Sequence, residues 1–315
     1  MQVGRIMEAM ATLYFTHPAC RQHEMGEGHP ECPARLDAIS DQLLASGVAA
    51  HLIEREAPRA TQEALLRVHT SEYLESLVER SPVHGYVELD PDTCMNPHTY
   101  TAALHAAGAA IAAVDAVLAG EGDSAFCAVR PPGHHACPDQ AMGFCFLNNV
   151  AIAVRHAIAH HGLTRVAVVD FDVHHGNGTE AALAGDERVL MCSFFQHPFY
   201  PFSGTAPWAD NMLNEPVPAY TEGAAIRELV SARWLPRLEQ FRPQLVLVSA
   251  GFDAHREDDL GSMGLVESDF GWITGQLVAL AERHGAPVVG CLEGGYNLSA
   301  LGRSATAHIR ALAGI

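Results

Sequence analysis

Six short apolar runs, rich in β-branched residues, constrain the fold of this chain more than any other feature. None shows the strict alternation of a half-exposed strand, so each is typical of a strand covered on both faces. They occupy residues 12–15, 124–129, 165–172, 189–194, 244–251 and 287–292. Helix-length segments separate them at residues 101–119, 147–161, 222–240 (broken or bent near Pro236) and 268–284. The alternation predicts an α/β fold, a doubly wound, mainly parallel sheet with helices on both faces.

The length of the chain fits one large α/β domain, to which we assign residues 11–315. Residues 1–10 precede the first apolar run, and we interpret them as a flexible N-terminal extension or as the product of an upstream start. The longest segment of small apolar residues, "TAALHAAGAAIAAVDAVLAG", is dominated by alanine and interrupted by His105 and Asp115. It predicts a buried helix rather than a membrane span.

Charge and cysteine content exclude some classes of function. With 19 basic and 37 acidic residues, the formal charge of −18 repels a phosphate backbone, so we expect no nucleic-acid partner. The eight cysteines include no CxxC pair and the N-terminus has no secretory signal, which predicts reduced thiols in the cytoplasm. The number of histidines alone indicates no metal, and we expect His160, His161 and His284 to be solvated or structural.

Polar residues gather where the predicted strands end. They follow or end four of the six runs, at residues 133–135, 170–175, 253 and 293–296. An open parallel sheet binds ligands in the crevice outside the carboxyl ends of its strands. We therefore expect these segments, which lie far apart in the sequence, to converge on one site.

The segment "DFDVHH" carries Asp170, Asp172 and His174 at intervals of two residues. On an extended backbone this spacing points all three side chains to one side, where they repel or stay unsatisfied unless a cation gathers them. Asp172, His174 and Asp253 make a three-ligand set that leaves coordination positions open, as in catalytic zinc sites. Fe(II) or Co(II) could also occupy such a set. The competing interpretation is a group of capped turns and salt-bridged residues.

Two further motifs supply proton chemistry beside such a metal. His134 and His135 follow a rigid Pro-Pro-Gly, and one of them can act as a general base toward the attacking water and then as an acid toward the leaving nitrogen. Asp170 and Asn177 are the nearby groups suited to orient these imidazoles. Tyr296 follows two glycines, and its hydroxyl can donate to a developing oxyanion. Taken alone, a structural histidine pair and a packed tyrosine are the competing interpretations.

Five motifs, taken together and in order, resemble the histone deacetylase family, most closely its bacterial class II-like amidohydrolases. They are "HPECPARL", "RPPGHHACPDQAMGFCFLNN", "VVDFDVHHGNGT", "SAGFDAHREDDLG" and "LEGGYN", and the similarity spans roughly residues 11 to 300. It implies a single domain with the arginase-deacetylase fold, a mainly parallel sheet flanked by helices on both faces. It also implies the zinc-dependent removal of acetyl or other acyl groups from Nε-acyl-lysine.

The resemblance implies roles for single residues as well. It implies that the zinc ligands are Asp172, His174 and Asp253. It also implies that His134 and His135 are the tandem catalytic histidines and that Tyr296 is the tyrosine that polarises the carbonyl. Asp170 would orient His134, and residue 177 would orient His135, which is the general base. Residue 177 is Asp in class I members but Asn here, as in class II; a neutral amide orients the imidazole without raising its basicity as an aspartate would.

A structural monovalent cation, usually potassium, is implied by the resemblance alone. It would lie near Asp170 and Ser193. The backbone carbonyls of Asp172, His174 and Phe194 would contribute ligands. A second such ion is implied at the backbone around residues 183–189. Neither follows from the spacing of side chains.

The resemblance also implies a narrow channel for the acylated side chain. Gly143 and Phe144 match its wall, as does the segment that contains Tyr200, although many relatives have phenylalanine at this last position. Leu260 matches a rim position at which polyamine-specific relatives carry a glutamate. A leucine cannot pair with a second ammonium group, which favours acyl-lysine substrates.

Several alternatives stay open at this point. The substrate is an acyl-lysine peptide or protein, or else an acetylated polyamine or another small amide handled by the same chemistry. A catalytically silent acyl-lysine-binding module predicts a damaged catalytic set, whereas every position is filled here. Dinuclear manganese chemistry of the arginase type shares the fold but fits the GHH and GGY segments less well. The oligomeric state, a homo-oligomer included, is left open.

Overall fold

The computed structural model describes residues 11–315, which form a single α/β domain around an eight-stranded parallel sheet. The order of the strands is β2-β1-β5-β10-β9-β6-β7-β8. These strands are β1 (Thr12–Thr16), β2 (Leu52–Glu56), β5 (Ser124–Cys127), β6 (Val166–Asp170), β7 (Val189–Gln196), β8 (Met212–Val217), β9 (Leu245–Ala250) and β10 (Val288–Leu292). The predicted fold class is therefore confirmed.

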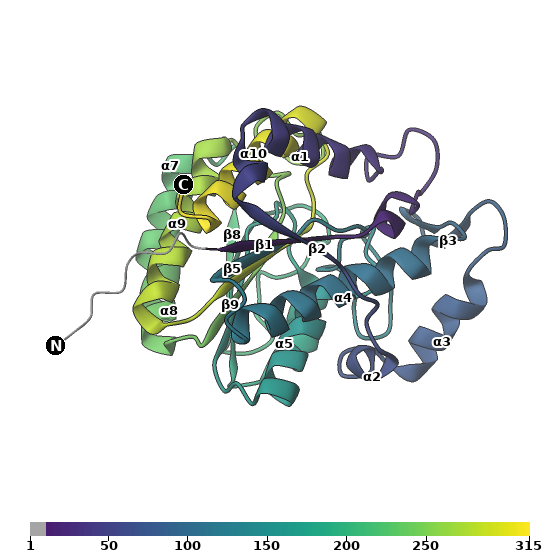
Figure 1. Cartoon of the computed structure of the whole chain (residues 1–315), viewed down its shortest axis with the longest axis horizontal. Coiled ribbons are helices and arrows are strands. Elements are labelled where there is room, and N and C mark those ends of the chain that lie inside the picture. The colour runs from purple at the N-terminus through teal and green to yellow at the C-terminus, as the bar shows by residue number, and fades with distance from the viewer. Residues whose placement is uncertain (1–10) are drawn as a thin grey trace.

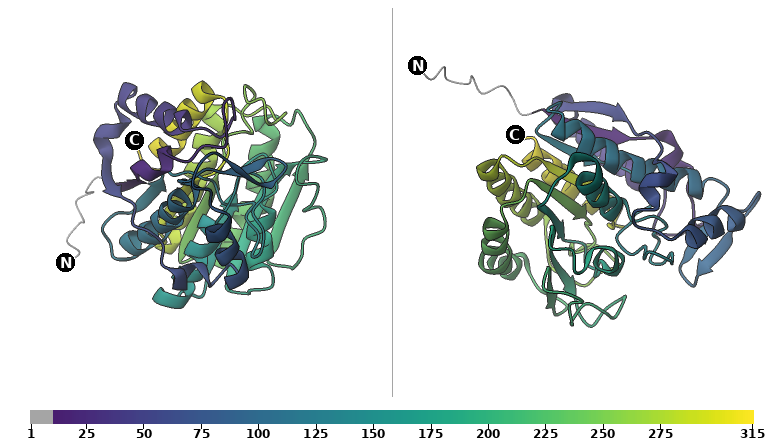
Figure 2. Two further views of the ribbon diagram at one scale, coloured as in Figure 1. Left: turned by 90° about the vertical axis from the view of Figure 1, so that its right-hand side faces the viewer. Right: turned by 90° about the horizontal axis from the view of Figure 1, so that it is seen from below.

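Helices cover both faces of the sheet. They are α1 (Ala34–Ala45), α2 (Gln62–Leu65), α3 (Ser71–Arg80), α4 (Thr99–Leu118), α5 (Asn149–His161), α6 (Asn177–Leu183), α7 (Gly223–Leu229), α8 (Leu235–Phe241), α9 (Glu267–His284) and α10 (Leu298–Leu312). Figure 1 shows α1, α9 and α10 on one side of the strands, with α4 and α5 on the other. A two-stranded antiparallel hairpin, β3 (Val87–Asp90) and β4 (Thr93–Met95), lies with α2 and α3 at one end of the molecule. This end projects beyond the sheet in the right-hand view of Figure 2.

All six predicted runs are strands, and both edge strands were missed. All six run through residues that are almost entirely buried, because helices cover them on both sides. By contrast β2, with the sequence LIERE, is largely exposed, and β8 contains Pro216 and several polar residues. Edge strands have one solvated side, so their sequences need not be apolar.

The third run is shorter than predicted, which corrects one step of the sequence argument. Strand β6 ends at Asp170, and the chain bends over residues 172–174. Asp172 and His174 therefore do not follow Asp170 on one extended backbone. They lie in the loop beyond the strand, where the tight bend rather than the pleat brings their side chains together.

The predicted break or bend in the segment 222–240 lies slightly before the proline. A π-helical turn, Val230–Trp234, joins α7 to α8 in one continuous helical stretch, and Pro236, which has no N–H to donate to the preceding turn, follows the π-helical turn closely. The prediction of an extension over residues 1–10 falls outside the described residues.

Within the described range, one helix is long and apolar enough to cross a membrane by length and composition. It is α4, and 67% of its most apolar window is buried inside the structure. It packs against β1, β5 and α5, as the alanine-rich sequence predicts for a helix of the core.

Four neighbouring strands in the middle of the sheet position the candidate site. They are β5, β10, β9 and β6, and their carboxyl ends lead into the loops that carry residues 133–135, 293–296, 253 and 172–175. The sheet thus brings the predicted polar segments to one edge.

Candidate active site

Three side chains meet at this edge with the geometry of a metal-binding set, and we call Asp172, His174 and Asp253 the strand-end site. Nδ1 of His174 lies 3.0 Å from Oδ1 of Asp172 and 3.2 Å from Oδ2 of Asp253. One ligand atom from each residue lies within 4.8 Å of the other two. Both carboxylates are fully buried, which leaves only the imidazole in partial contact with solvent.

The surroundings of the strand-end site favour a cation among its three groups. Oδ2 of Asp253 is buried without a hydrogen-bond partner, which is costly for a carboxylate. Burial, together with the nearby charge of Asp172, raises the pKa of Asp253 to about 7. A Cβ atom on Gly294 would lie 2.1 Å from that same oxygen, so the glycine leaves room for the carboxylates. The residues present therefore fit a divalent metal ion.

The tandem histidines are each held by a different partner. Nδ1 of His134 lies 3.0 Å from Oδ2 of Asp170, and Nδ1 of His135 lies 2.7 Å from Oδ1 of Asn177. An amide oxygen only accepts, so Nδ1 of His135 donates and its Nε2 is left unprotonated. The loop itself is anchored by Glu293, whose Oε2 accepts from the backbone N–H groups of Gly133 at 2.7 Å and His134 at 3.0 Å.

Adjacent in sequence, the two histidines have opposite electrostatic environments. Burial lowers the pKa of His134, but Asp172 and Asp170 outweigh this effect and raise it well above its ordinary value. Burial also lowers the pKa of His135, and the neighbouring His134 and His174 lower it further, far below the ordinary range. His135 is thus the neutral imidazole that a general base requires, and His134 is held as a cation.

Tyr296 lies in a turn that two other residues fix in place. Asp258 accepts through Oδ2 from the backbone N–H of Tyr296 at 2.6 Å and of Asn297 at 2.9 Å. The guanidinium of Arg35 lies 4.9 Å from the centre of the Tyr296 ring, and its Nε donates to the carbonyl of Gly295 at 2.7 Å. Burial raises the pKa of Tyr296 well above 10, so the phenol stays protonated and can donate a hydrogen bond.

A fully buried charged network beneath this turn was not predicted. Oε1 of Glu31 accepts from Nη1 of Arg35 at 3.0 Å, and its Oε2 accepts from Nη2 of Arg130 at 2.5 Å. Arg35 also donates through Nη2 to the carbonyl of Glu293 at 2.5 Å. Charged groups with no exposure need such pairing. The motifs "HPECPARL" and "RPPGHH" contain these residues, and their unusual content of charge beside proline was the signal that could have revealed them.

Aromatic side chains line the approach to the strand-end site. Phe144 lies edge-to-face with Tyr296, with ring centres 5.7 Å apart, and Tyr200 lies edge-to-face with His135 at 5.2 Å. Phe199, which was not singled out, stacks on His174 at 5.3 Å. Gly143 has φ +55°, and a Cβ there would lie 2.4 Å from Cδ2 of His135, so only glycine fits.

Leu260 follows the loop that carries Asp253 and Asp258. Its backbone N–H donates to Oδ1 of Asp258 at 3.0 Å, and the other oxygen of the same carboxylate holds the Tyr296 turn. Leu260 is half-buried. The structure thus links the predicted rim position to the predicted carbonyl-polarising residue, while the effect of Leu260 on substrates remains a prediction.

The predicted potassium positions lie where two strands pair. Asp170 of β6 is in register with Ser193 of β7, directly before Phe194. At the second predicted position, three carbonyl oxygens, those of residues 183, 186 and 189, converge on Nδ2 of Asn211, which lies 3.1 to 3.2 Å from each and has two N–H groups to share among them. The ions themselves remain predictions.

His175 has a different role from its neighbours. Its Nε2 lies 2.8 Å from Oε2 of Glu180, and its ring packs against Phe195. Its contacts are therefore with Glu180 and Phe195 rather than with the three residues of the strand-end site.

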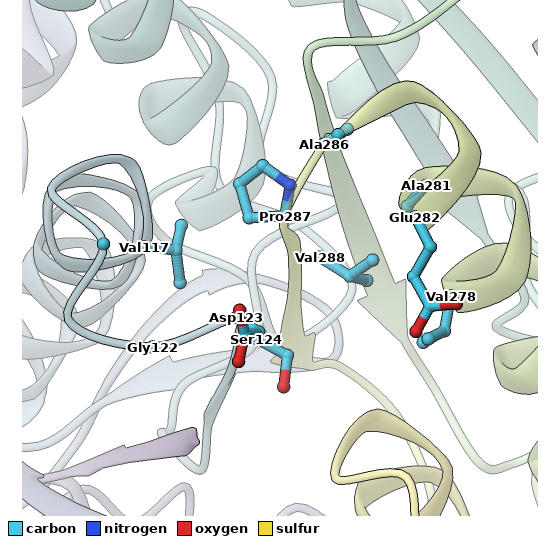
Figure 3. Close-up of a pocket in the computed structure, with 12 residues that line it drawn as sticks. Val117, Gly122, Asp123, Ser124, Val278, Ala281, Glu282, Ala286, Pro287 and Val288 are labelled. Carbon is cyan, nitrogen blue, oxygen red and sulfur yellow. The ribbon is translucent and has the colours of Figure 1, made fainter. Parts of the chain in front are cut away.

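A separate pocket lies at the opposite end of the strands, where β5 and β10 begin. It is formed around the start of β5 and β10 and the C-terminal end of α9, by residues that include Ser124, Val288 and Glu282 (Figure 3). Among the described residues that line it, Asp123 and Glu282 are the ionisable groups, and none is a histidine or cysteine. The chemistry-bearing side chains are therefore at the carboxyl ends of the strands.

Comparisons with known proteins agree with this arrangement. Residues 29–312 match the family model described as "Histone deacetylase domain". The histone deacetylase-like amidohydrolase of Pseudomonas aeruginosa is 43% identical over 91% of this chain and 78% of its own length. A probable deacetylase of Archaeoglobus fulgidus is 36% identical over 92% of this chain and 82% of its own length. The crystal structure of the HDA15 HD domain superposes with a TM-score of 0.91 at 33% identity, covering 97% and 90% of the two chains.

Proposed function

Because the chain belongs to the histone deacetylase family and is a hydrolase that acts on amides, we propose that it removes acetyl or other acyl groups from Nε-acyl-lysine in a peptide or protein. The observation that carries this proposal is the pair of adjacent histidines with opposite pKa shifts beside three convergent metal-type ligands. Amide hydrolysis needs a base for water, a proton for the leaving amine and stabilisation of an oxyanion, and each has a candidate here.

Zinc is the metal that we propose for the strand-end site. Two carboxylates and one imidazole with open coordination positions are typical of a catalytic zinc centre, and Fe(II) or Co(II) would suit the same ligands. Bound there, zinc would act as a Lewis acid on the amide carbonyl. We also propose that a structural potassium ion lies near Asp170 and Ser193, which are paired in register.

His135 is the proposed general base. Its Nε2 is free to accept a proton from the water that attacks the carbonyl carbon, since Nδ1 donates to Asn177. The carbon–nitrogen bond then breaks, the acyl group leaves as a carboxylate, and the proton passes to the lysine nitrogen. His134 is cationic beside Asp170 and balances negative charge while this happens.

Tyr296 is the proposed oxyanion donor. Its phenol is protonated at neutral pH, and the two contacts that hold its turn, from Asp258 and Arg35, fix the direction of the hydroxyl before the substrate binds. A donor aimed in advance at the developing charge requires no reorganisation during the reaction.

The substrate preference rests on the walls of the approach. Phe144, Phe199 and Tyr200 present aromatic surface to a methylene chain, and Leu260 offers no charge to a second ammonium group. All eight cysteines lie within the described residues and are free thiols, which supports a cytoplasmic location.

Turnover of two matched substrates tests the proposal. Zinc-reconstituted enzyme should hydrolyse an acetyl-lysine peptide with a kcat/KM at least about tenfold above that of an acetylated polyamine, because Leu260 supplies no counter-charge. Leu260→Glu should move the ratio toward the polyamine, and Leu260→Met is the matched control. A preference for the polyamine in the unchanged enzyme would contradict the proposed substrate. Binding of the peptide without turnover would contradict the proposed activity.

A further inference from the structure

A second cluster of histidine and aspartate lies on two helices, away from the strand-end site. Asp115 belongs to α4, and His156 and His161 belong to α5, which packs beside it on the same face of the sheet. Nε2 of His156 and Nε2 of His161 each lie 2.6 Å from the same oxygen, Oδ1 of Asp115. We propose that these three side chains, which we call the helix site, bind a second divalent transition-metal ion, with zinc as the best match.

The donor atoms suit such an ion in kind and in spacing. Two imidazole nitrogens and one carboxylate oxygen lie within 4.8 Å of one another. Zinc bonds to nitrogen and oxygen are about 2.0–2.2 Å long, so tetrahedral ligands lie about 3.4 Å apart. The two imidazoles would each move less than about 1 Å away from the carboxylate to admit the ion.

Access to the helix site is also suitable. The side chain of Asp115 is 45% exposed and that of His161 is 25% exposed, whereas that of His156 is only 11% exposed. An ion can thus enter from solvent, and water can complete its coordination while His156 anchors it to the protein. The ion would join α4 to α5 through their side chains.

Arg67 determines how strongly the ion can bind. Its Nη1 lies 3.3 Å from Nδ1 of His156. An arginine only donates, so without metal Nδ1 of His156 accepts and its Nε2 carries the proton that faces Asp115. A metal ion on Nε2 moves that proton to Nδ1, where it would meet the guanidinium. Arg67 must then turn away toward Glu63, its ion-pair partner at 2.8 Å, and this cost weakens binding.

The helix site is too remote to take part in the proposed reaction. Helix α5 begins beside the tandem histidines, where Nδ2 of Asn148 donates to the carbonyl of Ala136 at 3.3 Å. His161 is the last residue of that helix, about 18 Å further along its axis at 1.5 Å per residue. The ion would therefore bind independently of turnover, and the inference does not rest on the proposed function.

Metal content tests the inference directly. The full-length protein is dialysed to equilibrium against buffer of known Zn²⁺ concentration, and the bound metal per chain is taken from the difference in metal content across the membrane. Co²⁺ absorption spectra report the ligand set. The unchanged protein should hold one ion more than Asp115→Ala, and His161→Ala should bind that ion at least tenfold more weakly. His160→Ala is the matched control, because His160 stacks on His156 at 5.0 Å but is not one of the three ligands, and it should keep the ion.

Arg67→Gln gives the sharper test. Its Kd for the additional ion should fall about tenfold, since the guanidinium no longer opposes the proton on His156. Deacetylase turnover and the circular dichroism of every variant should match the unchanged protein, which shows that each one folds. Equal metal content in the unchanged protein and in Asp115→Ala would overturn the inference, and so would an unchanged Kd in Arg67→Gln.

Discussion

The strand-end site and the helix site use the same types of ligand in different environments. The strand-end site has two carboxylates with no exposure and one imidazole, whereas the helix site has one partly exposed carboxylate and two imidazoles. Burial raises the pKa of Asp253 to about 7. Burial also tends to raise the pKa of Asp115, but hydrogen bonds from His161 and His156 outweigh it and leave the pKa below its usual value.

This difference shows why one cluster needs a cation more than the other. In the strand-end site a buried carboxylate oxygen has no hydrogen-bond partner, so the metal-free state is poorly satisfied. In the helix site two imidazole N–H groups already satisfy the carboxylate, and solvent reaches it. We therefore expect tight binding at the strand-end site and weaker, exchangeable binding at the helix site.

The largest expected difference in kcat comes from replacing a histidine by alanine in each of the two regions. His135→Ala removes the proposed base and should lower kcat by about 10²- to 10⁴-fold. His161→Ala should leave kcat within about twofold, because it lies at the far end of α5 and touches no reacting group. Steady-state rates on one acetyl-lysine peptide measure both. A comparable loss of activity in the two variants would show that the helix site acts on catalysis.

Tyr296→Phe should have the next largest effect. It removes one hydroxyl whose role is confined to the transition state, so kcat should fall by about 10²- to 10³-fold. Bound zinc should not change, because the tyrosine is not part of the strand-end site. Measuring bound zinc together with kcat distinguishes the loss of the oxyanion donor from the loss of the metal. If zinc were lost together with activity, the phenol would be supporting the metal rather than the oxyanion.

A contrast between buried and exposed segments also explains how much of the fold could be predicted from the sequence. Buried strands such as β6 and β9 are recognisable because both faces need apolar residues. Strand β2 is not, since the side chains of LIERE are mostly solvated and its strand state depends on pairing with β1. Pairing between distant segments leaves little local trace in an edge strand.

Within the strand-end site, Asp172, His174 and Asp253 were predictable from polar residues at the ends of apolar runs. The network of Glu31 and its two arginines was not, because Arg130 lies 99 residues from Glu31 in the sequence and pairs with it only after folding. The helix site was also missed, and His161 was expected to be solvated or structural. His156 and His161 are five residues apart, about 140° around an ideal helix, which is not the spacing of one face. They meet only because Asp115 approaches from α4.

His308 shows the effect of burial on a pKa without a nearby carboxylate. In the strand-end site both effects act on the same groups. His308 lies on α10, and burial alone lowers its pKa to about 3. As the pH falls below about 6.5, the unfolded chain binds a proton that the folded protein excludes, so stability decreases. Between pH 6.5 and 5 this group should contribute a loss of about 1.6 kcal/mol to the free energy of unfolding.

Urea unfolding of the unchanged protein and of His308→Gln measures this contribution. The difference between the two proteins should narrow as the pH falls from 6.5 to 5 and stay nearly constant from pH 7 to 8, where His308 is neutral in both states. If the difference did not change below pH 6.5, the imidazole would have to be reached by water or by a carboxylate in the folded protein.

The smallest expected effect is that of the helix site without metal. Asp115→Asn removes the charge of a partly exposed group, and such pairs contribute about 0.2–1 kcal/mol to the free energy of unfolding. Asp41→Asn, at an exposed position on α1, is the matched control. Chemical unfolding in the presence of a chelator should show a loss within that range for Asp115→Asn. With Zn²⁺ at about a hundred times the Kd of the helix site, ligand linkage at that site should add about 2.7 kcal/mol to the unchanged protein and to Asp41→Asn, but not to Asp115→Asn. A larger loss in the chelator would mean that the helix site is a structural ion pair, in which case the contrast with the strand-end site would be one of burial and not of metal affinity.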